Sequence, residues 1–224
     1  MNIVEAVKKK KSLRKLDNSL IEINQKINPE KKKNIIKIIK ETRNYWNRMY
    51  GQFWEKEHKS FNERATFYTE LYTKIFAINN FKTILDISAG LNPLSYKLIP
   101  NYKKKKFIVT ELTTIDCEFL RNYLLKEKIN SEVYRIDLRK DFSLNGDICF
   151  LFKILDLFDH KTAERILKSV NCPIIVVSFS TITIKGNKMN YPKRGWFEQM
   201  IRRLDFKFEI LNFKNEIFYI LKKN

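Results

Sequence analysis

Apolar residues recur with two different periods along this chain of 224 residues. In the first quarter they return every three or four positions, which is typical of helices with one buried face. We therefore expect two or three helices within residues 3–54, the last of them starting near Pro29, where a missing backbone N–H is tolerated. A further helix is expected over residues 60–76.

After residue 80, short apolar runs alternate with helical segments. Strands are predicted at 81–87, 106–110, 132–136, 147–152 and 173–179, with helical segments at 94–99, 115–128, 161–170 and 196–204. This alternation predicts a parallel sheet covered by helices on both faces, and two runs at 206–213 and 216–221 predict a closing antiparallel hairpin. The expected fold is α/β and Rossmann-like at 57–224, with a small helical lobe at 1–56.

The net charge of the chain indicates which kind of partner it binds. The chain has 44 basic and 25 acidic residues, a formal charge of +19, and residues 1–56 alone hold 15 basic and 6 acidic ones. Composition bias is one explanation, but an unbalanced excess of this size favours binding to a phosphate backbone. We expect the basic helical lobe to bind RNA, with contacts from Lys8, Lys9, Lys10 and Lys11.

Several other classes of protein are disfavoured. No apolar run approaches the roughly 18 residues of a membrane helix and no secretory signal is evident, so we expect a cytoplasmic protein without a membrane partner. Three widely spaced cysteines and two histidines suggest neither a disulfide framework nor a metal centre. Motifs for nucleotide hydrolysis, acyl transfer and metalloprotease chemistry are missing from the sequence.

The clearest chemical signal is a single glycine turn after the first predicted strand. Gly90 closes that strand, and Glu111 follows the next strand 21 residues later, where a carboxylate would accept hydrogen bonds from ribose hydroxyls. A dinucleotide fold carries three glycines at this turn to admit a pyrophosphate, whereas one glycine favours a phosphate-free cofactor such as S-adenosylmethionine (SAM). A SAM-dependent methyltransferase sheet also ends in an antiparallel hairpin.

Longer motifs carry a family resemblance. The run Asp86-Ile87-Ser88-Ala89-Gly90-Leu91-Asn92-Pro93-Leu94 resembles the D-I-A-C-G-L-N-P-L motif of the aminoglycoside-resistance 16S rRNA (guanine-N7) methyltransferases of the ArmA and Rmt type. Matching segments in order and spacing cover roughly residues 60–224, and they include Asn62-Glu63-Arg64, Phe152-Lys153 in the fourth predicted long strand, Val177-Ser178-Phe179, and the ending Glu216-Ile217-Phe218-Tyr219. The chain departs from this family in its shorter, lysine-rich N-terminal part.

The resemblance implies roles for individual residues. Arg64 is expected to bind the methionine carboxylate of SAM, Gly90 to lie against the cofactor and Glu111 to bind its ribose. The remaining cofactor contacts implied are Asp86, Asp137, Leu138 and Phe152. Phe152 and Lys153 are the expected catalytic residues beside the methyl group.

The resemblance also implies the substrate. Methylation of guanine N7 in small-subunit rRNA near the decoding site, with aminoglycoside resistance as one outcome, is the expected activity of a monomer bound to the small ribosomal subunit. RNA contacts near the target base are expected from Lys185, Lys188, Lys193 and Arg194. Two alternatives stay open: methylation of another RNA such as tRNA, and a non-catalytic SAM-binding module that assists ribosome assembly.

Overall fold

The computed structural model of the chain describes residues 2–27, 35–51, 59–183, 186–190 and 192–223. It divides into two compact units. The N-terminal unit is Met1–Ser60 with Thr113–Ile115, and the sheet unit is Phe61–Leu112 with Asp116–Asn224. Each unit is described by itself below.

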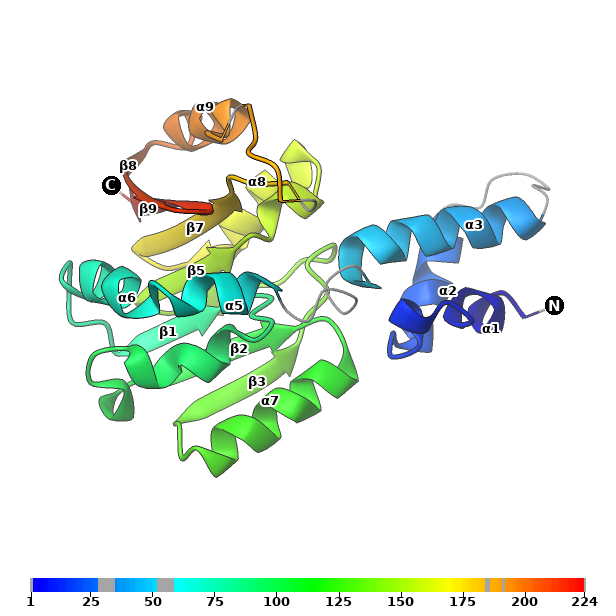
Figure 1. The fold of residues 1–224 in the computed structure, drawn as a ribbon, viewed down its shortest axis with the longest axis horizontal. Helices are drawn as coiled ribbons and strands as arrows, with labels where there is room; N and C mark the ends of the chain where they lie inside the picture. The colour runs from blue at the N-terminus through cyan, green and yellow to red at the C-terminus, as the bar shows by residue number, and fades with distance from the viewer. Residues whose placement is uncertain (1, 28–34, 52–58, 184–185, 191, 224) are drawn as a thin grey trace. The chain divides into compact units, whose positions relative to one another are not determined.

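The N-terminal unit is helical (Figure 1). Its described elements are α1 (Ile3–Lys8), the 3-10 turn η1 (Lys11–Leu13), α2 (Asn18–Ile27), α3 (Ile35–Trp46) and the π-helical turn η2 (Asn47–Gly51). Val7, Leu13 and Trp46 are fully buried, so apolar side chains from α1, η1 and α3 share one small core. These helices confirm the predicted helical lobe, while the start expected near Pro29 lies outside the described residues.

The sheet unit is built on seven strands in the order β3-β2-β1-β5-β7-β9-β8 (Figure 1). The five parallel strands are β1 (Thr83–Asp86), β2 (Lys106–Glu111), β3 (Ser131–Arg135), β5 (Ile148–Phe152) and β7 (Ile174–Ser180). The hairpin of β8 (Phe206–Phe213) and β9 (Glu216–Lys223) completes the sheet antiparallel to β7. The predicted parallel sheet with a terminal hairpin is confirmed.

Helices pack on both faces of the sheet. Strand side chains alternate between two apolar cores, as Ile84 and Leu85 of β1 show by pointing into different ones. One core includes α5 (Lys59–Ala65), α6 (Tyr68–Phe76) and α7 (Thr114–Lys126), and the other includes α8 (His160–Ser169) and α9 (Gly195–Arg203). Because both faces are buried, the strands consist largely of apolar runs.

The connections differ from the prediction in three places. The helix expected over 60–76 is two helices, because the chain breaks at Phe67, whose φ is −136° and whose N–H donates to the carbonyl of Arg64 over 2.8 Å. The segment after Gly90 is a 3-10 helix, η3 (Asn92–Leu98), and further 3-10 turns follow at η4 (Tyr102–Lys104) and η5 (Leu155–Leu157). A small separate sheet pairs β4 (Leu144–Asn145) with β6 (Val170–Asn171). No helix among the described residues is long and apolar enough to cross a bilayer.

Candidate active site

The predicted site residues gather because β1, β2, β3 and β5 are parallel. Their carboxyl ends lie at one edge of the sheet, and the residues that end or follow these strands are Asp86, Glu111, Asp137 and Lys153. In open parallel sheets this edge is where ligands bind.

The turn after β1 leaves room for a ligand at Gly90. Gly90 has φ +56°, a left-handed conformation that suits glycine, and no atom lies within 4 Å of the position where a Cβ would stand. Its N–H donates to Oε1 of Glu111 over 2.6 Å. The structure thus joins the predicted glycine and the predicted ribose-binding carboxylate directly.

Glu111 is a carboxyl group with an unusual proton affinity. Burial, with a smaller contribution from Asp116, raises its pKa from the ordinary 4.5 to about 7. The backbone N–H groups of Gly90 and Leu112 oppose this shift by donating to its oxygens. Glu111 therefore changes charge near neutral pH, and in its ionised form it accepts hydrogen bonds well.

Asp86 is fully buried and braces the turn that follows. Its Oδ2 accepts from Asn92 Nδ2 at 2.6 Å and from the Tyr96 hydroxyl at 2.8 Å. Burial raises its pKa from 3.8 to about 6, against the effect of these two donors. Asp86 thus holds η3 in place, and its expected contact with the cofactor stays a prediction.

Beyond β3, Asp137 and Leu138 occupy the edge in different ways. Asp137 accepts from the backbone N–H, Nε and Nη2 of Arg139, and although burial opposes its charge, Arg139 holds the pKa of Asp137 below its ordinary value. The side chain of Leu138 is buried in the core that contains α8. Its carbonyl accepts from Arg165 Nη2.

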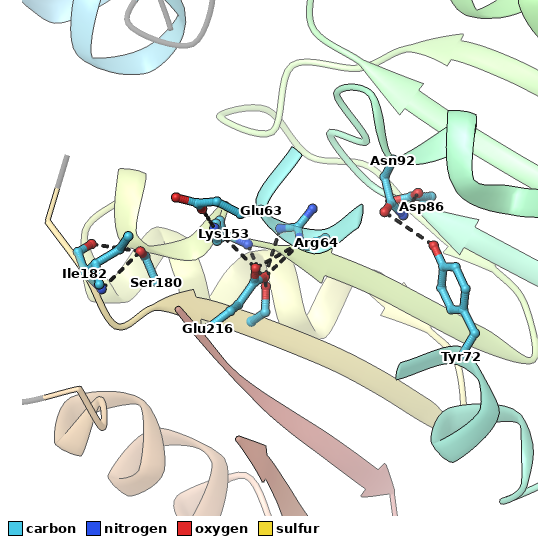
Figure 2. A network of polar contacts seen from close by, with 10 residues as sticks. Glu63, Arg64, Tyr72, Asp86, Asn92, Lys153, Ser180, Ile182 and Glu216 are labelled. Atoms are coloured by element: carbon cyan, nitrogen blue, oxygen red, sulfur yellow. Dashed lines mark hydrogen bonds and ion pairs between the residues drawn. The ribbon is translucent and has the colours of Figure 1, made fainter. Parts of the chain in front are cut away.

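The most prominent feature of the edge is a network of four charged side chains, of which Arg64 and Glu216 are buried and Glu63 and Lys153 are mostly buried (Figure 2). Arg64 on α5 donates from Nε and Nη2 to both carboxylate oxygens of Glu216 on β9, over 2.9–3.0 Å. Lys153 Nζ lies 3.2 Å from Glu216 and 3.0 Å from Glu63. Two cations and two carboxylates thus compensate one another at the ends of β5 and β9.

This network fixes the predicted catalytic pair. Lys153 has φ +57°, which is uncommon for a residue with a side chain, and its N–H donates to the carbonyl and the hydroxyl of Ser178. Ser178 in turn donates to Glu216. The ring of Phe152 lies under the Arg64 guanidinium, 4.9 Å from its centroid. Glu63 and Glu216 were not predicted as site residues, although both lie within the motifs that match the family. Arg64 and Glu216 are 152 positions apart, and nothing in the sequence near either residue indicates that they form an ion pair.

Arg194 was expected to contact RNA, and its surroundings argue against that. It is buried, its guanidinium donates to Asp156 over 2.8–3.2 Å and to the carbonyl of Ser180 over 3.0 Å, and it lies over the Phe179 ring. Its donors thus hold the loop after β7 instead of facing solvent.

The predicted lysines of both basic segments differ from Arg194 in exposure. Lys188 and Lys193 are exposed, and Lys185 lies outside the described residues. In the N-terminal unit, Lys9 and Lys11 are exposed, while Lys8 and Lys10 are half-buried. An open hollow of about 600 Å³ is lined by the following residues: Asn2, Val4, Glu5, Lys8, Lys9, Arg14, Asn18 and Glu22.

The residues at the edge fit a SAM-type cofactor. The open space beside Gly90 admits a ligand close to the backbone, and Glu111 stands next to that space with oxygens able to accept from ribose hydroxyls. Arg64 offers a permanent positive charge nearby for a carboxylate, because Glu216 outweighs the burial that opposes this charge.

A family comparison agrees with the geometry. Residues 54–220 match the family model described as ribosomal RNA methyltransferase (FmrO). Two curated relatives are 16S rRNA (guanine(1405)-N(7))-methyltransferases. The one from Serratia marcescens is 30% identical over 187 residues, covering 75% of this chain and 68% of the relative. The one from Frankia casuarinae is 24% identical over 176 residues, covering 74% and 61%.

Solved structures show the same fold. The 16S rRNA methylase RmtB superposes with a TM-score of 0.79 at 21% identity, covering 100% of this chain and 99% of that one. The 16S rRNA methylase ArmA gives 0.59 at 26% identity, with coverage of 75% and 88%. The RmtB match covers the whole chain and shows that the two proteins share a fold.

Proposed function

This chain belongs to the ribosomal RNA methyltransferase (FmrO) family, and from that membership we propose that it methylates N7 of a guanine in 16S rRNA, using SAM. The alignment covers 61% of the length of the Frankia relative. That this chain has the activity of the whole relative is therefore part of the proposal. The observation that carries it is the pair Phe152-Lys153, held at the end of β5 by the network of four charged side chains in a sheet of methyltransferase topology.

The residues at the edge divide the work of holding the cofactor. Arg64 binds the methionine carboxylate, Glu111 the ribose hydroxyls, and Asp137 with Leu138 the adenine, while the backbone at Gly90 approaches closely. Asp86 supports this pocket through Asn92 and Tyr96. When bound, the cofactor supplies a methyl group on a positively charged sulfur.

Guanine N7 carries an exposed lone pair, so no proton has to be removed before attack. The protein needs only to orient the base and the methyl group in line and to keep water out. Phe152 offers a buried aromatic surface at this point, and Lys153, paired with Glu63 and Glu216, holds the end of β5 in place beside it. A general base is not part of this mechanism.

RNA binding is assigned to two basic surfaces. Lys188 and Lys193 lie on the segment between β7 and α9, and Arg194 supports this segment from inside. Lys185, which lies outside the described residues, is assigned to the same surface from its place in the sequence. The run of Lys8, Lys9, Lys10 and Lys11 provides the second surface. We propose that a monomer binds the small ribosomal subunit in the cytoplasm through these surfaces.

Labelled SAM tests the proposal directly. The protein is incubated with [methyl-³H]SAM and, separately, with 30S subunits, free 16S rRNA and tRNA, and labelled m7G is mapped by borohydride and aniline cleavage. Label at one guanine of 16S rRNA is the expected result. Label only in tRNA would favour a tRNA methyltransferase, and SAM binding without label in any RNA would favour an assembly module. Either of these outcomes overturns the proposal.

Aminoglycoside resistance is a separate outcome of the same reaction. A methyl group at N7 of a decoding-site guanine adds bulk and positive charge where these cationic drugs bind. Expression of the chain in a susceptible strain should then raise the inhibitory concentration of aminoglycosides, while Lys153→Met should not. A methylated guanine mapped away from the decoding site would leave the methyltransferase activity intact and contradict resistance.

A further inference from the structure

Two aromatic rings are stacked at the starts of α8 and α9. His160 is the first residue of α8 and Trp196 the second of α9, and their rings lie 6° from parallel with centroids 4.4 Å apart. Trp196 is half-buried, and Phe179 and Phe197 meet it in edge-to-face geometry at 6.0 and 5.7 Å. The indole is therefore held from the core side, and the imidazole forms the outer layer of the stack.

The imidazole has an open face. His160 is exposed although Trp196 covers one side of its ring, so its accessible surface lies on the opposite side and along the ring edge. The imidazole makes no hydrogen bond or ion pair with any residue that the structure describes. Packing on Trp196 thus uses only one of its two faces. A flat aromatic face supported from behind is the kind of surface on which proteins stack an unpaired nucleobase.

The stack lies at the edge of the sheet that holds the candidate active site. Helix α8 follows β5 and α9 follows β7, and these two parallel strands end at the same edge. His160 follows Lys153 by seven positions, so the Cα atoms of the two residues are at most about 25 Å apart. Nucleotides next to a base bound at the end of β5 would come within reach of the stack.

The charges around the stack suit an RNA backbone. Lys161 and Lys193 flank the two helix starts, and both are exposed and make no ion pair with the residues that the structure describes. The carboxylates of the same segments are already engaged, because Asp159 caps α8 and Asp156 pairs with Arg194 over 2.8 Å. The lysines can therefore meet phosphates on either side of a stacked base.

We propose that the His160–Trp196 stack binds one unpaired base of the RNA substrate, a neighbour of the methylated guanine. This inference rests on the proposed function, because it takes the substrate to be RNA methylated at the end of β5. Every base has a flat π surface, so the stack would fix the position of the strand without reading its sequence. It would thus help to hold the target guanine in line with the methyl group.

Substitutions of His160 separate stacking from charge. Filter binding of the full-length protein to 30S subunits at several salt concentrations gives the dissociation constant and its salt dependence. His160→Ala should weaken binding about tenfold, the loss typical of one stacked base, and leave the slope of the salt dependence unchanged. His160→Phe keeps a flat ring and should bind within about twofold of the wild type. Lys161→Gln is the matched comparison, and it should reduce the slope by about 1 because it removes a phosphate contact.

Two further measurements separate this role from a structural one. His160→Ala should bind SAM as the wild type does, and its melting temperature should stay within about 4 °C, because the imidazole is exposed. The inference is overturned if His160→Ala binds 30S subunits with wild-type affinity or loses affinity for SAM as well. It is also overturned if His160→Phe loses as much affinity as His160→Ala, or if His160→Ala reduces the slope as Lys161→Gln does. A wild-type protein that methylates no RNA would instead refute the proposed function.

Discussion

Cations serve different purposes in the two units of this protein. In the sheet unit, Arg64 and Lys153 are buried or nearly so, and each faces the carboxylate of Glu216 at about 3 Å. In the N-terminal unit, Lys9 and Lys11 lie exposed on a unit with a large excess of positive charge. A buried cation stabilises one geometry, whereas exposed cations create a field that attracts a polyanion. Net charge alone does not distinguish the two.

The largest effect is expected where the buried charges lose their compensation. Glu216→Ala leaves Arg64 and Lys153 facing each other without a shared carboxylate, so the free energy of unfolding should fall by about 3–5 kcal/mol. Glu216→Gln keeps the shape and should lose less. Urea denaturation measures both.

The matched control for this substitution is on the same hairpin. Glu209→Ala removes a carboxylate that pairs with Lys222 over 2.7 Å at the surface, and should cost less than about 1 kcal/mol. Equal losses for Glu216→Ala and Glu209→Ala would mean that the network around Glu216 contributes no more to stability than a surface ion pair does. Buried and exposed cations would then not differ in their structural role.

The next effect separates catalysis from RNA attraction. Lys153→Met removes the cation that pairs with Glu63 and Glu216 beside Phe152 and should lower the methylation rate about 100-fold, the size of loss that a misplaced reacting geometry produces. RNA affinity should change less than about twofold, since the residue is mostly buried. Filter binding and single-turnover methylation provide the two measurements.

Lys168→Met is the control here, because Lys168 pairs with Glu164 on the exposed side of α8. It should leave rate and affinity unchanged. If Lys153→Met reduced RNA affinity as strongly as the methylation rate, Lys153 would act in RNA binding as the exposed lysines do, and not as a structural cation like Arg64.

These two predictions depend on contacts that the sequence indicated unequally. The strands of the sheet were predictable because a strand buried on both faces reads as a short apolar run, as Ile148–Phe152 does. Gly90 and Glu111 were predictable because their spacing follows from one βαβ unit. The Arg64–Glu216 pair was not, since the two residues meet only when β9 inserts beside β7.

Arg194 and the break between α5 and α6 depend on two further contacts that the sequence did not indicate. Arg194 lies in a basic segment, so composition predicts exposure, yet its planar guanidinium meets Asp156 and Phe179 inside the fold. The break between the helices contains no proline or glycine. At the break, the ring of Phe67 stacks on the ring of Phe213, with centroids 4.4 Å apart. Neither contact is visible in a local sequence window.

The third prediction concerns the exposed charges. Replacing Lys9 and Lys11 by Gln should weaken 16S rRNA binding about tenfold and reduce the salt dependence, with a slope smaller by about 1.5–2. The free energy of unfolding should stay within about 0.5 kcal/mol of the wild type, because both side chains are exposed. Binding at several salt concentrations measures the slope.

A charge-matched double variant gives the control. Lys103 and Lys104 are also exposed but lie in the sheet unit, away from both proposed RNA surfaces in the sequence. Replacing both by Gln should alter affinity less than about twofold. Equal losses for the two double variants would show that total charge, not the N-terminal lysines, governs RNA binding.

The smallest effect is a pH dependence that acts in opposite directions on stability and on cofactor binding. The pKa of Glu111 is raised to about 7, so without ligand its contribution to stability is present below its ordinary pKa of 4.5 and is lost as the pH rises through 7. SAM binding needs the ionised carboxylate, so affinity should instead rise about threefold from pH 6.5 to 7.5, following the ionised fraction. Calorimetry at both pH values measures this, and Glu111→Gln should bind SAM more weakly and without the threefold change.

Asp86 has a pKa of about 6 and titrates mainly below this window, so a dependence that survives in Glu111→Gln would assign the proton to another group. A buried carboxyl group of the sheet unit would then differ from the exposed lysines of the N-terminal unit in a further way: salt should alter its contribution little, whereas a change of one pH unit should alter it measurably.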